Sequence, residues 1–448
     1  MTDAAAERAD SLAETAEELA SEHPGASYAR GARILSLGIA ATGVFTFAYF
    51  AVASHVLSAS QYGSVALLWS ILFVVISVIY RPVEQLLSRT IADRRARGLH
   101  HSHPLRIPLV IQAGFAAAFL VAALALKPQI VHLFHGSQSL YWIFTGAALA
   151  YAASYFARGY FAGHQWFALY GGLVLFESVS RFCFPVAVAI GIASGQTAVA
   201  AGILAAPIAS LLVVPWAIVR HTRLDAEAPQ PDLAAMTLRA GAGFALAVAG
   251  IQLAEQTLVN AGVIIANGLA GSAVAGAVFN VLLITRAPLQ LFQSIQTSLL
   301  PHLAGLEATE GHEAFARAIH TTIRAIAGFA GLVALGLLLI GPAVMRIVFG
   351  SGTTYSRWGL AVVAVGMGFH LASGTFNQAA LARGRARQAV LAWSIAALLF
   401  VGWMVLPAVS SLLTRAEVGY AAASALLFLM LWLLYRRSTP ARPADALT

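Results

Sequence analysis

Two arginines stand inside long apolar stretches of the chain, where a charge is costly. Arg286 lies near the middle of the apolar stretch 273–300, and Arg81 lies deep in a similar stretch much earlier in the chain. An arginine at the centre of a membrane-spanning helix costs roughly 2.5–3.5 kcal/mol by insertion scales. Its planar guanidinium group forms paired hydrogen bonds with the oxygens of phosphate and carboxylate groups. The two arginines therefore predict a path for an anionic substrate.

The elements that must position these arginines are helices that cross a membrane. The mean hydropathy is +0.77, and 59% of the residues are hydrophobic. Apolar runs of about 20 residues recur along the chain, and at 1.5 Å per residue this length crosses a bilayer. The sequence predicts an all-α integral membrane protein with about twelve transmembrane helices. The expected spans lie near 33–57, 62–87, 107–127, 139–162, 169–193, 197–219, 240–266, 273–300, 318–341, 358–381, 388–407 and 417–435.

The basic residues are distributed unevenly between the two sides of this predicted bundle. They gather in the N-terminal region, in the connections that follow the even-numbered spans and at the C-terminus. Because Lys and Arg favour cytoplasmic loops, we expect both termini in the cytoplasm and a multi-pass protein of the plasma (inner cell) membrane. The same bias accounts for the net charge of +8, so we expect no nucleic-acid partner.

The two halves of the chain share a pattern. The second span ends in Arg81-Pro82, and the eighth contains Arg286-Ala287-Pro288. The pattern predicts a duplication that produces parallel repeats, with Pro82 and Pro288 as hinges that bend their helices. The predicted parts are an acidic cytoplasmic tail at 1–29, a six-helix bundle at 30–220, a cytoplasmic linker at 221–236, a second six-helix bundle at 237–437 and a cytoplasmic tail at 438–448.

Several of these features are typical of one transporter superfamily. Residues 36–63 combine a glycine-rich first span with the turn Gln61-Tyr62-Gly63, and residues 82–97 form a passage of Leu, Gln, Ser and Arg. Over roughly residues 30–437 the chain resembles the multidrug/oligosaccharidyl-lipid/polysaccharide exporter superfamily, and within it the polysaccharide flippases of the Wzx type. The resemblance implies two pseudo-symmetric six-helix bundles around a central cavity that opens alternately to each side. It also implies an undecaprenyl-diphosphate-linked saccharide as the substrate.

Three arginines are candidates for binding such a diphosphate. Arg286 is about fourteen residues, or about 21 Å, below the start of its span, and we expect it to face a water-filled cavity or to pair with Glu255. Arg81 either grips the same diphosphate from the opposite bundle or extends to the cytoplasmic surface. Arg181 follows Glu177 by four residues, a spacing that favours an intrahelical ion pair. Alternatively, Arg181 joins the cationic lining and Glu177 is released to bind a coupling cation or sugar hydroxyls.

Other polar residues inside the spans are candidates for ion coupling or for the cavity wall. Glu255 shares its span with Gln256 and Asn260 and is the stronger candidate for coupling to a proton or sodium gradient. His370 and Asn377 lie on one face of the tenth span, where such residues commonly form hydrogen bonds between helices. No metal or cofactor is expected, because the three histidines of the basic loop near residue 100 lack carboxylate or thiol partners.

Together with the family resemblance, which alone points to the saccharide, these observations predict a flippase. It would move a diphosphate-lipid-linked oligosaccharide from the inner to the outer leaflet for cell-surface polysaccharide biosynthesis, by alternating access, with a proton or sodium gradient as the candidate driving force. Two alternatives within the superfamily stay open, namely a multidrug or cation antiporter and a flippase of peptidoglycan lipid precursors. Three intramembrane arginines disfavour a cationic drug as substrate.

An enzyme is disfavoured for a different reason. The predicted outer segments 128–139 and 342–357 are short and contain no Asp or Glu for acid–base chemistry. The expected partners are therefore the lipid bilayer and the anionic lipid-linked saccharide, and we expect the protein to be a monomer.

Overall fold

The chain folds into long α-helices that run side by side. The computed structural model describes residues 24–96, 105–212, 238–286, 288–289, 311–350, 352–383 and 385–437. Within these residues all regular structure is α-helical, and ten helical stretches are long and apolar enough to cross a membrane. Two shorter apolar helices, Gly195–Leu211 and Ser272–Arg286, overlap the first parts of the two remaining expected spans, 197–219 and 273–300. Residues 213–219, 287 and 290–300 of these spans lie outside the described residues. The prediction of an all-α membrane protein is confirmed.

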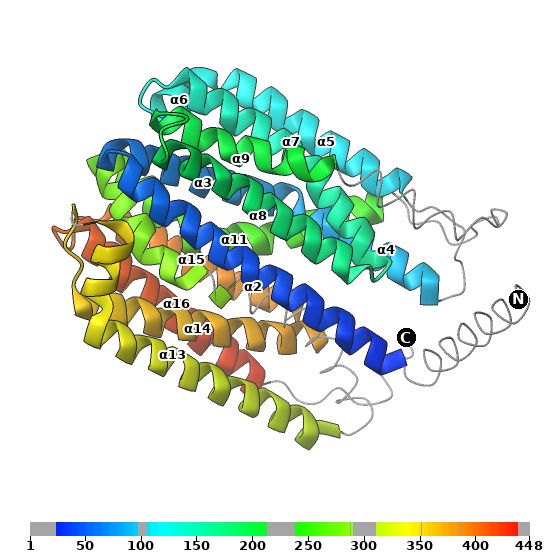
Figure 1. Ribbon diagram of the computed structural model, residues 1–448. Helices are drawn as coiled ribbons and strands as arrows, with labels where there is room; N and C mark the ends of the chain where they lie inside the picture. The colour runs from blue at the N-terminus through cyan, green and yellow to red at the C-terminus, as the bar shows by residue number, and fades with distance from the viewer. Residues whose placement is uncertain are drawn as a thin grey trace, which may run out of the picture.

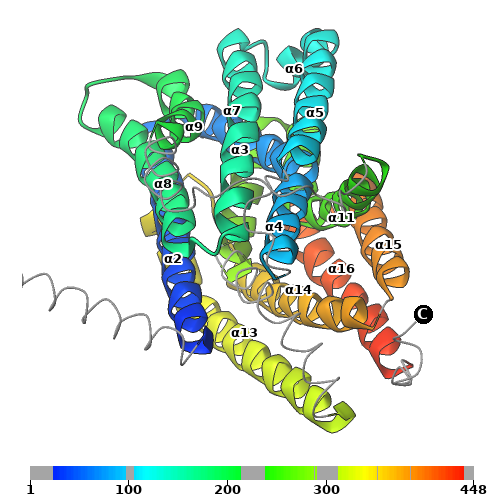
Figure 2. The ribbon, with the colours of Figure 1, turned by 90° about the vertical axis from the view of Figure 1, so that its right-hand side faces the viewer.

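The helices form two groups that follow the order of the chain (Figure 1). The second view, turned by a quarter, keeps α5 to α9 apart from α13, α14 and α16 (Figure 2). The first group comprises α2 Pro24–Val56, α3 Ala59–Ile79, α4 Arg81–Ala96, α5 Arg106–Ala125, α6 Lys127–Leu133, α7 Gln138–Gly163, α8 Phe167–Ala189 and α9 Gly195–Leu211. The second comprises α11 Leu238–Ala270, the short helix Ser272–Arg286, α13 Gly311–Phe349, α14 Arg357–Ala382, α15 Ala386–Val405 and α16 Leu412–Arg436.

The two groups meet through a few helices. α11 packs against α3 and α4, and α2 touches α13. The predicted linker 221–236, the tail 438–448 and most of the tail 1–29 lie outside the described residues. The domain limits and the cytoplasmic placement of the termini therefore stay predictions.

Glycines allow the closest approaches inside the first group. A Cβ atom built on Gly38 of α2 would lie 2.9 Å from the Cα of Gly171 on α8. Two glycines of α7 face α4 in the same way. A Cβ atom on Gly159 would lie 2.8 Å from the carbonyl oxygen of Glu84, and one on Gly163 would lie 2.6 Å from the Cβ of Ile91. Small residues at such positions let helix backbones come together in a membrane, where van der Waals packing drives helix association.

A similar contact joins the two groups at the end that carries the α2–α3 turn. A Cβ atom on Gly63 of α3 would lie 1.7 Å from the carbonyl oxygen of Ser272, and one on Gly276 would lie 3.1 Å from the Cα of Gly63. Beside this crossing, the Tyr62 hydroxyl donates a hydrogen bond to the side-chain oxygen of Asn280. We call these five residues the seam, because they hold α3 against the short helix Ser272–Arg286.

The seam makes a prediction about stability. We expect Gly63→Ala to lower the thermal stability of the protein, because the added methyl group overlaps the backbone at Ser272, and overpacking of this kind costs about 1–3 kcal/mol. The measurement is thermal unfolding of the purified protein in detergent, followed by tryptophan fluorescence. Gly114→Ala on α5 is the control, since nothing lies within 4 Å of the added atom there. Equal melting temperatures for both variants would contradict the close contact.

The helix that carries Arg81 is interrupted. α3 ends at Ile79, α4 begins at Arg81, and the carbonyl oxygen of Tyr80 accepts hydrogen bonds from the backbone N–H groups of Val83 (3.1 Å) and Glu84 (3.0 Å). The interruption stands beside Pro82, as expected for a residue that has no N–H to donate. Pro288 is half-buried, but its neighbours 287 and 290–310 lie outside the described residues. The hinge roles of both prolines stay predictions.

Candidate functional site

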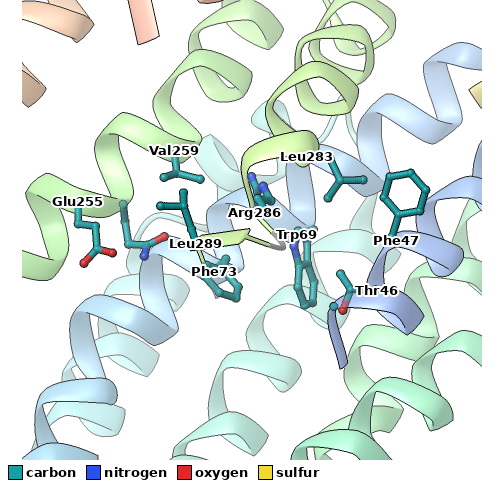
Figure 3. Close-up of a pocket in the computed structure, with 11 residues that line it drawn as sticks. Thr46, Phe47, Trp69, Phe73, Glu255, Val259, Leu283, Arg286 and Leu289 are labelled. Carbon is teal, nitrogen blue, oxygen red and sulfur yellow. The ribbon is translucent and has the colours of Figure 1, made fainter. Parts of the chain in front are cut away.

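A small cavity lies between the two groups of helices, and Arg286 is part of its wall (Figure 3). Its volume is about 30 Å³, which is room for roughly two water molecules. This enclosed space is small, so we expect a diphosphate or a sugar to bind only after the cavity widens. The residues that matter for its chemistry are Thr46, Trp69 and Phe73 from the first group and Glu255, Gln256 and Arg286 from the second.

The Arg286 side chain is 7% exposed and has neutral hydrogen-bond partners. Its Nη2 donates to the side-chain oxygen of Asn260 at 2.6 Å and to the Ser70 hydroxyl at 3.4 Å. These bonds take the place of the ion pair with Glu255 that the sequence allowed. The Nε atom of Arg286 is buried and has no hydrogen-bond partner. A buried cation with an unused donor is an unsatisfied site for an anion.

Arg81 is half-buried and reaches the second group of helices without lining the cavity. Its Nη1 lies 3.5 Å from the side-chain oxygen of Gln252, whose amide donates to Glu255 at 3.2 Å. Glu255 does line the cavity. Arg81 and Arg286 are therefore not placed to bind one diphosphate together in this conformation. Joint binding stays a prediction for a conformation with a wider cavity.

Gln256 and Asn260 form a chain of hydrogen bonds that ends at Arg286. Asn260 is fully buried, and its amide donates to the side-chain oxygen of Gln256 at 2.9 Å while its own oxygen accepts from Arg286. Gln256 lines the cavity. The sequence placed these two residues among the cavity candidates, and the structure brings both to the arginine.

His370 and Asn377 join helices of the second group. The Nδ1 atom of His370 is 3.2 Å from the Tyr420 hydroxyl, and the indole N–H of Trp393 donates to the side-chain oxygen of Asn377 at 3.1 Å. These contacts link α14 to α16 and to α15. Neither residue lines the cavity described above.

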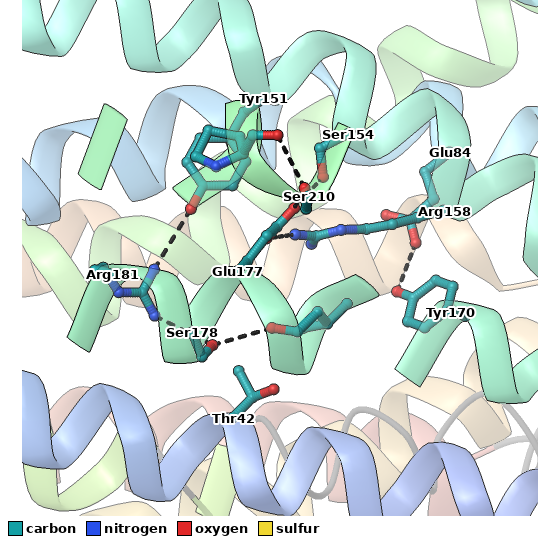
Figure 4. A network of polar contacts seen from close by, with 12 residues as sticks. Thr42, Glu84, Tyr151, Ser154, Arg158, Tyr170, Glu177, Ser178, Arg181 and Ser210 are labelled. Carbon is teal, nitrogen blue, oxygen red and sulfur yellow. Dashed lines mark hydrogen bonds and ion pairs between the residues drawn. The ribbon is translucent and has the colours of Figure 1, made fainter. Parts of the chain in front are cut away.

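The expected pairing of Glu177 with Arg181 is wrong. Glu177 of α8 makes its ion pair with Arg158 of α7 and accepts a hydrogen bond from Ser154 (Figure 4). The Ser210 hydroxyl donates to the same carboxylate at 3.3 Å. The physical reason is that Arg158 reaches Glu177 from a facing helix, and a contact between helices overrides the weak preference for pairs four residues apart.

Arg181 lies directly behind the cavity wall. Its Nη2 donates to the Thr46 hydroxyl at 2.8 Å, and its Nη1 donates to the Tyr151 hydroxyl at 3.4 Å. Its guanidinium carbon lies 4.4 Å from the centre of the Trp69 ring. The side chain is 3% exposed and does not line the cavity, although Thr46 and Trp69 do. Direct contact between Arg181 and a substrate is thus not available in this conformation.

Arg158 and its neighbour Glu84, two polar residues of the first group, were not among the candidates expected from the sequence. Glu84 of α4 accepts a hydrogen bond from the Tyr170 hydroxyl at 2.7 Å. The signal was available for Arg158, because it lies inside the expected span 139–162 and so satisfies the criterion that singled out Arg286. Within the described residues, no three His, Cys, Asp or Glu side chains come together as a metal site; the histidines near residue 100 lie outside them.

Comparisons with known proteins identify the fold. No family model and no curated protein matches the sequence, whereas 33 chains of solved structures match the fold. A multidrug resistance MATE family transporter of the MOP superfamily, solved in an inward-facing conformation, is 13% identical, covers 90% of this chain and 97% of its own, and has a TM-score of 0.69. A mutant of the Vibrio cholerae MATE transporter VcmN is 13% identical, with coverage of 92% and 97% and a TM-score of 0.67.

A third similar structure concerns the polarity of the binding pocket. A MOP superfamily transporter from Pyrococcus furiosus, for which a reversed polarity of the binding pocket suggests a different function, is 14% identical. It covers 91% of this chain and 94% of its own, with a TM-score of 0.67. These identities are too low to indicate a substrate. Across nine-tenths of its length the chain has the fold of the MATE transporters of the MOP superfamily.

Proposed function

We propose that the protein is a transporter that moves a diphosphate-lipid-linked oligosaccharide from the inner to the outer leaflet by alternating access. One observation carries this proposal: Arg286, buried in the cavity wall between the two groups of helices, has neutral hydrogen-bond partners and an unused Nε donor. A diphosphate would supply the negatively charged acceptor oxygens that this guanidinium group does not have among its present partners.

The geometry supports a sequence of events. The seam closes the end that carries the α2–α3 turn, which we predict to face outside. Widening from the opposite end would let phosphate oxygens replace Asn260 and Ser70 as partners of Arg286. The acyl tail would remain in the bilayer between the bundles, because only the polar head group gains from the cavity. Opening of the seam would then release the head group on the other side.

A multidrug or cation antiporter is the second candidate, and one observation favours it. The cavity is also lined by the carboxylate of Glu255 and by the rings of Phe47, Trp69 and Phe73, a combination that suits a lipophilic cation. A flippase of peptidoglycan lipid precursors would use Arg286 in the same way as the leading candidate, since that substrate also carries a diphosphate.

Reconstitution of the purified protein into liposomes separates these candidates. A fluorescent lipid-diphosphate oligosaccharide placed in one leaflet should appear in the other, while ethidium should not be taken up. Uptake of ethidium without lipid transfer would overturn the proposal. A comparison of saccharide chains with a peptidoglycan precursor then identifies the preferred head group.

Glu255 is the proposed coupling residue. We expect Glu255→Gln to transport the lipid at a rate that no longer responds to an imposed proton or sodium gradient, because an amide neither takes up a proton nor carries a charge. Transfer rates in liposomes with and without each gradient provide the measurement. Glu84→Gln, which removes a carboxylate outside the cavity lining, should keep the response. An unchanged gradient response in Glu255→Gln would exclude this role.

A further inference from the structure

The cavity has a cation behind one of its walls. Trp69 and Thr46 line the cavity, and both contact Arg181, which does not line it. The guanidinium carbon lies 4.4 Å from the centre of the Trp69 ring, within the range of a cation–π contact. Figure 3 shows Trp69 and Thr46 side by side in the lining. Two adjacent wall residues therefore stand in front of the same positive charge.

Within the described residues, no carboxylate forms an ion pair with Arg181. Glu177 makes its ion pair with Arg158. The hydrogen bonds of Arg181 go to the hydroxyl groups of Thr46, Tyr151 and Ser178, at 2.8, 3.4 and 3.4 Å. The hydroxyl groups hold the guanidinium group in position without removing its charge, so its field extends through the wall into the cavity.

An aromatic ring that already has a cation on it is a poor site for a second cation. At an effective dielectric constant of about 20, two unit charges about 8 Å apart repel each other about as strongly as a ring attracts a cation. A lipophilic cation therefore gains nothing from Trp69, whereas an anion is attracted by Arg181 as well as by Arg286. With Arg181 behind it, the aromatic wall formed by Trp69 therefore favours an anion over the lipophilic cation that an isolated ring would bind.

We infer that Arg181, from behind Trp69 and Thr46, sets the charge selectivity of the cavity: it favours anionic head groups of the phosphate class and rejects lipophilic cations. This inference rests on the proposed transport of an anionic substrate through the same cavity. Arg181 is a selectivity residue without direct contact with the substrate, and Arg286 is the residue that binds it.

The test uses two probes of nearly the same shape and opposite charge, tetraphenylborate and tetraphenylphosphonium, which like the substrate require the widened cavity. Binding of each to the protein in nanodiscs is measured by equilibrium dialysis, with protein-free nanodiscs as the correction for partition into lipid. In Arg181→Gln we expect the affinity for the cation to rise about tenfold and that for the anion to fall about tenfold. Arg181→Lys keeps the charge and should bind both probes like the wild type. Arg181→Met replaces the glutamine variant if that one does not fold.

A purely structural role of Arg181 would change both affinities in the same direction, and this result would overturn the inference. An Arg181→Lys variant that behaves like Arg181→Gln would overturn it too. Trp69→Leu leaves the charge in place and should keep the preference for the anion; a reversed preference would identify the ring as the determinant. Arg286 is intact in all these variants. If lipid transfer survives the loss of Arg286, the proposed function fails, whereas an unchanged probe ratio in Arg181→Gln rejects the selectivity role alone.

Discussion

Replacing Arg286 with alanine is expected to reduce transfer of the diphosphate-linked lipid by about a hundredfold or more. Among the described residues that line the cavity, Arg286 is the only arginine or lysine. Hydrogen bonds to charged groups contribute about 1.5–3 kcal/mol each, and a guanidinium group makes two of them with a phosphate. Loss of both hydrogen bonds lowers the affinity for the substrate by roughly two to four powers of ten. The transfer rate falls by the same factor at substrate concentrations where binding limits transfer.

The measurement is the rate of lipid transfer in liposomes, taken over a range of substrate densities. Arg286→Lys keeps the positive charge but loses the planar guanidinium group that forms two parallel hydrogen bonds, so it should retain part of the activity. Arg346→Ala is the matched control, because this arginine is exposed on α13. Transfer at the wild-type rate by Arg286→Ala would show that the diphosphate does not bind at this cavity.

The second large effect concerns the ion pair inside the first group of helices. We expect Glu177→Leu to destabilise the protein by about 3–5 kcal/mol, because it leaves the charge of Arg158 buried without its partner. Glu177 is 3% exposed and also accepts a hydrogen bond from Ser154, which would lose this acceptor. Unfolding of the purified protein in detergent, by heat or denaturant, gives the change in stability.

The double variant Glu177→Leu with Arg158→Leu distinguishes this account from a general loss of packing. Replacing both partners of a buried ion pair by apolar residues is often close to neutral. The double variant should therefore be more stable than Glu177→Leu alone. If the double variant is the less stable of the two, the stranded charge of Arg158 is not the cause of the destabilisation.

Hydropathy predicted the helices well because it depends on each segment alone. Twelve apolar runs correspond to the ten long and two short apolar helices. Depth within a span was equally informative for Arg286, which lies in the wall of a cavity between the groups of helices. The length of an apolar segment and the depth of a residue within it are both distances along a single helix, so both can be read from the sequence.

The partners of the charged side chains could not be predicted in the same way. Spacing along a helix pairs Glu177 with Arg181, whereas the rotation of α7 and α8 about their axes pairs it with Arg158. The same limit explains Arg181, whose place behind Trp69 depends on how α8 faces the cavity. Rotation and relative depth of neighbouring helices are set by side-chain packing, which a single sequence does not reveal.

The seam has a consequence for how the proposed transporter responds to its surroundings. Its contact is made by Tyr62, Gly63, Ser272, Gly276 and Asn280, none of which carries a charge. Dissolved salt screens charges and has nothing to screen in such a contact. The proposed loading of an anionic head group, in contrast, depends on arginines and should weaken as ionic strength rises. The two ends of the proposed transport cycle should therefore respond to different variables, with salt acting on substrate capture and temperature on opening of the seam.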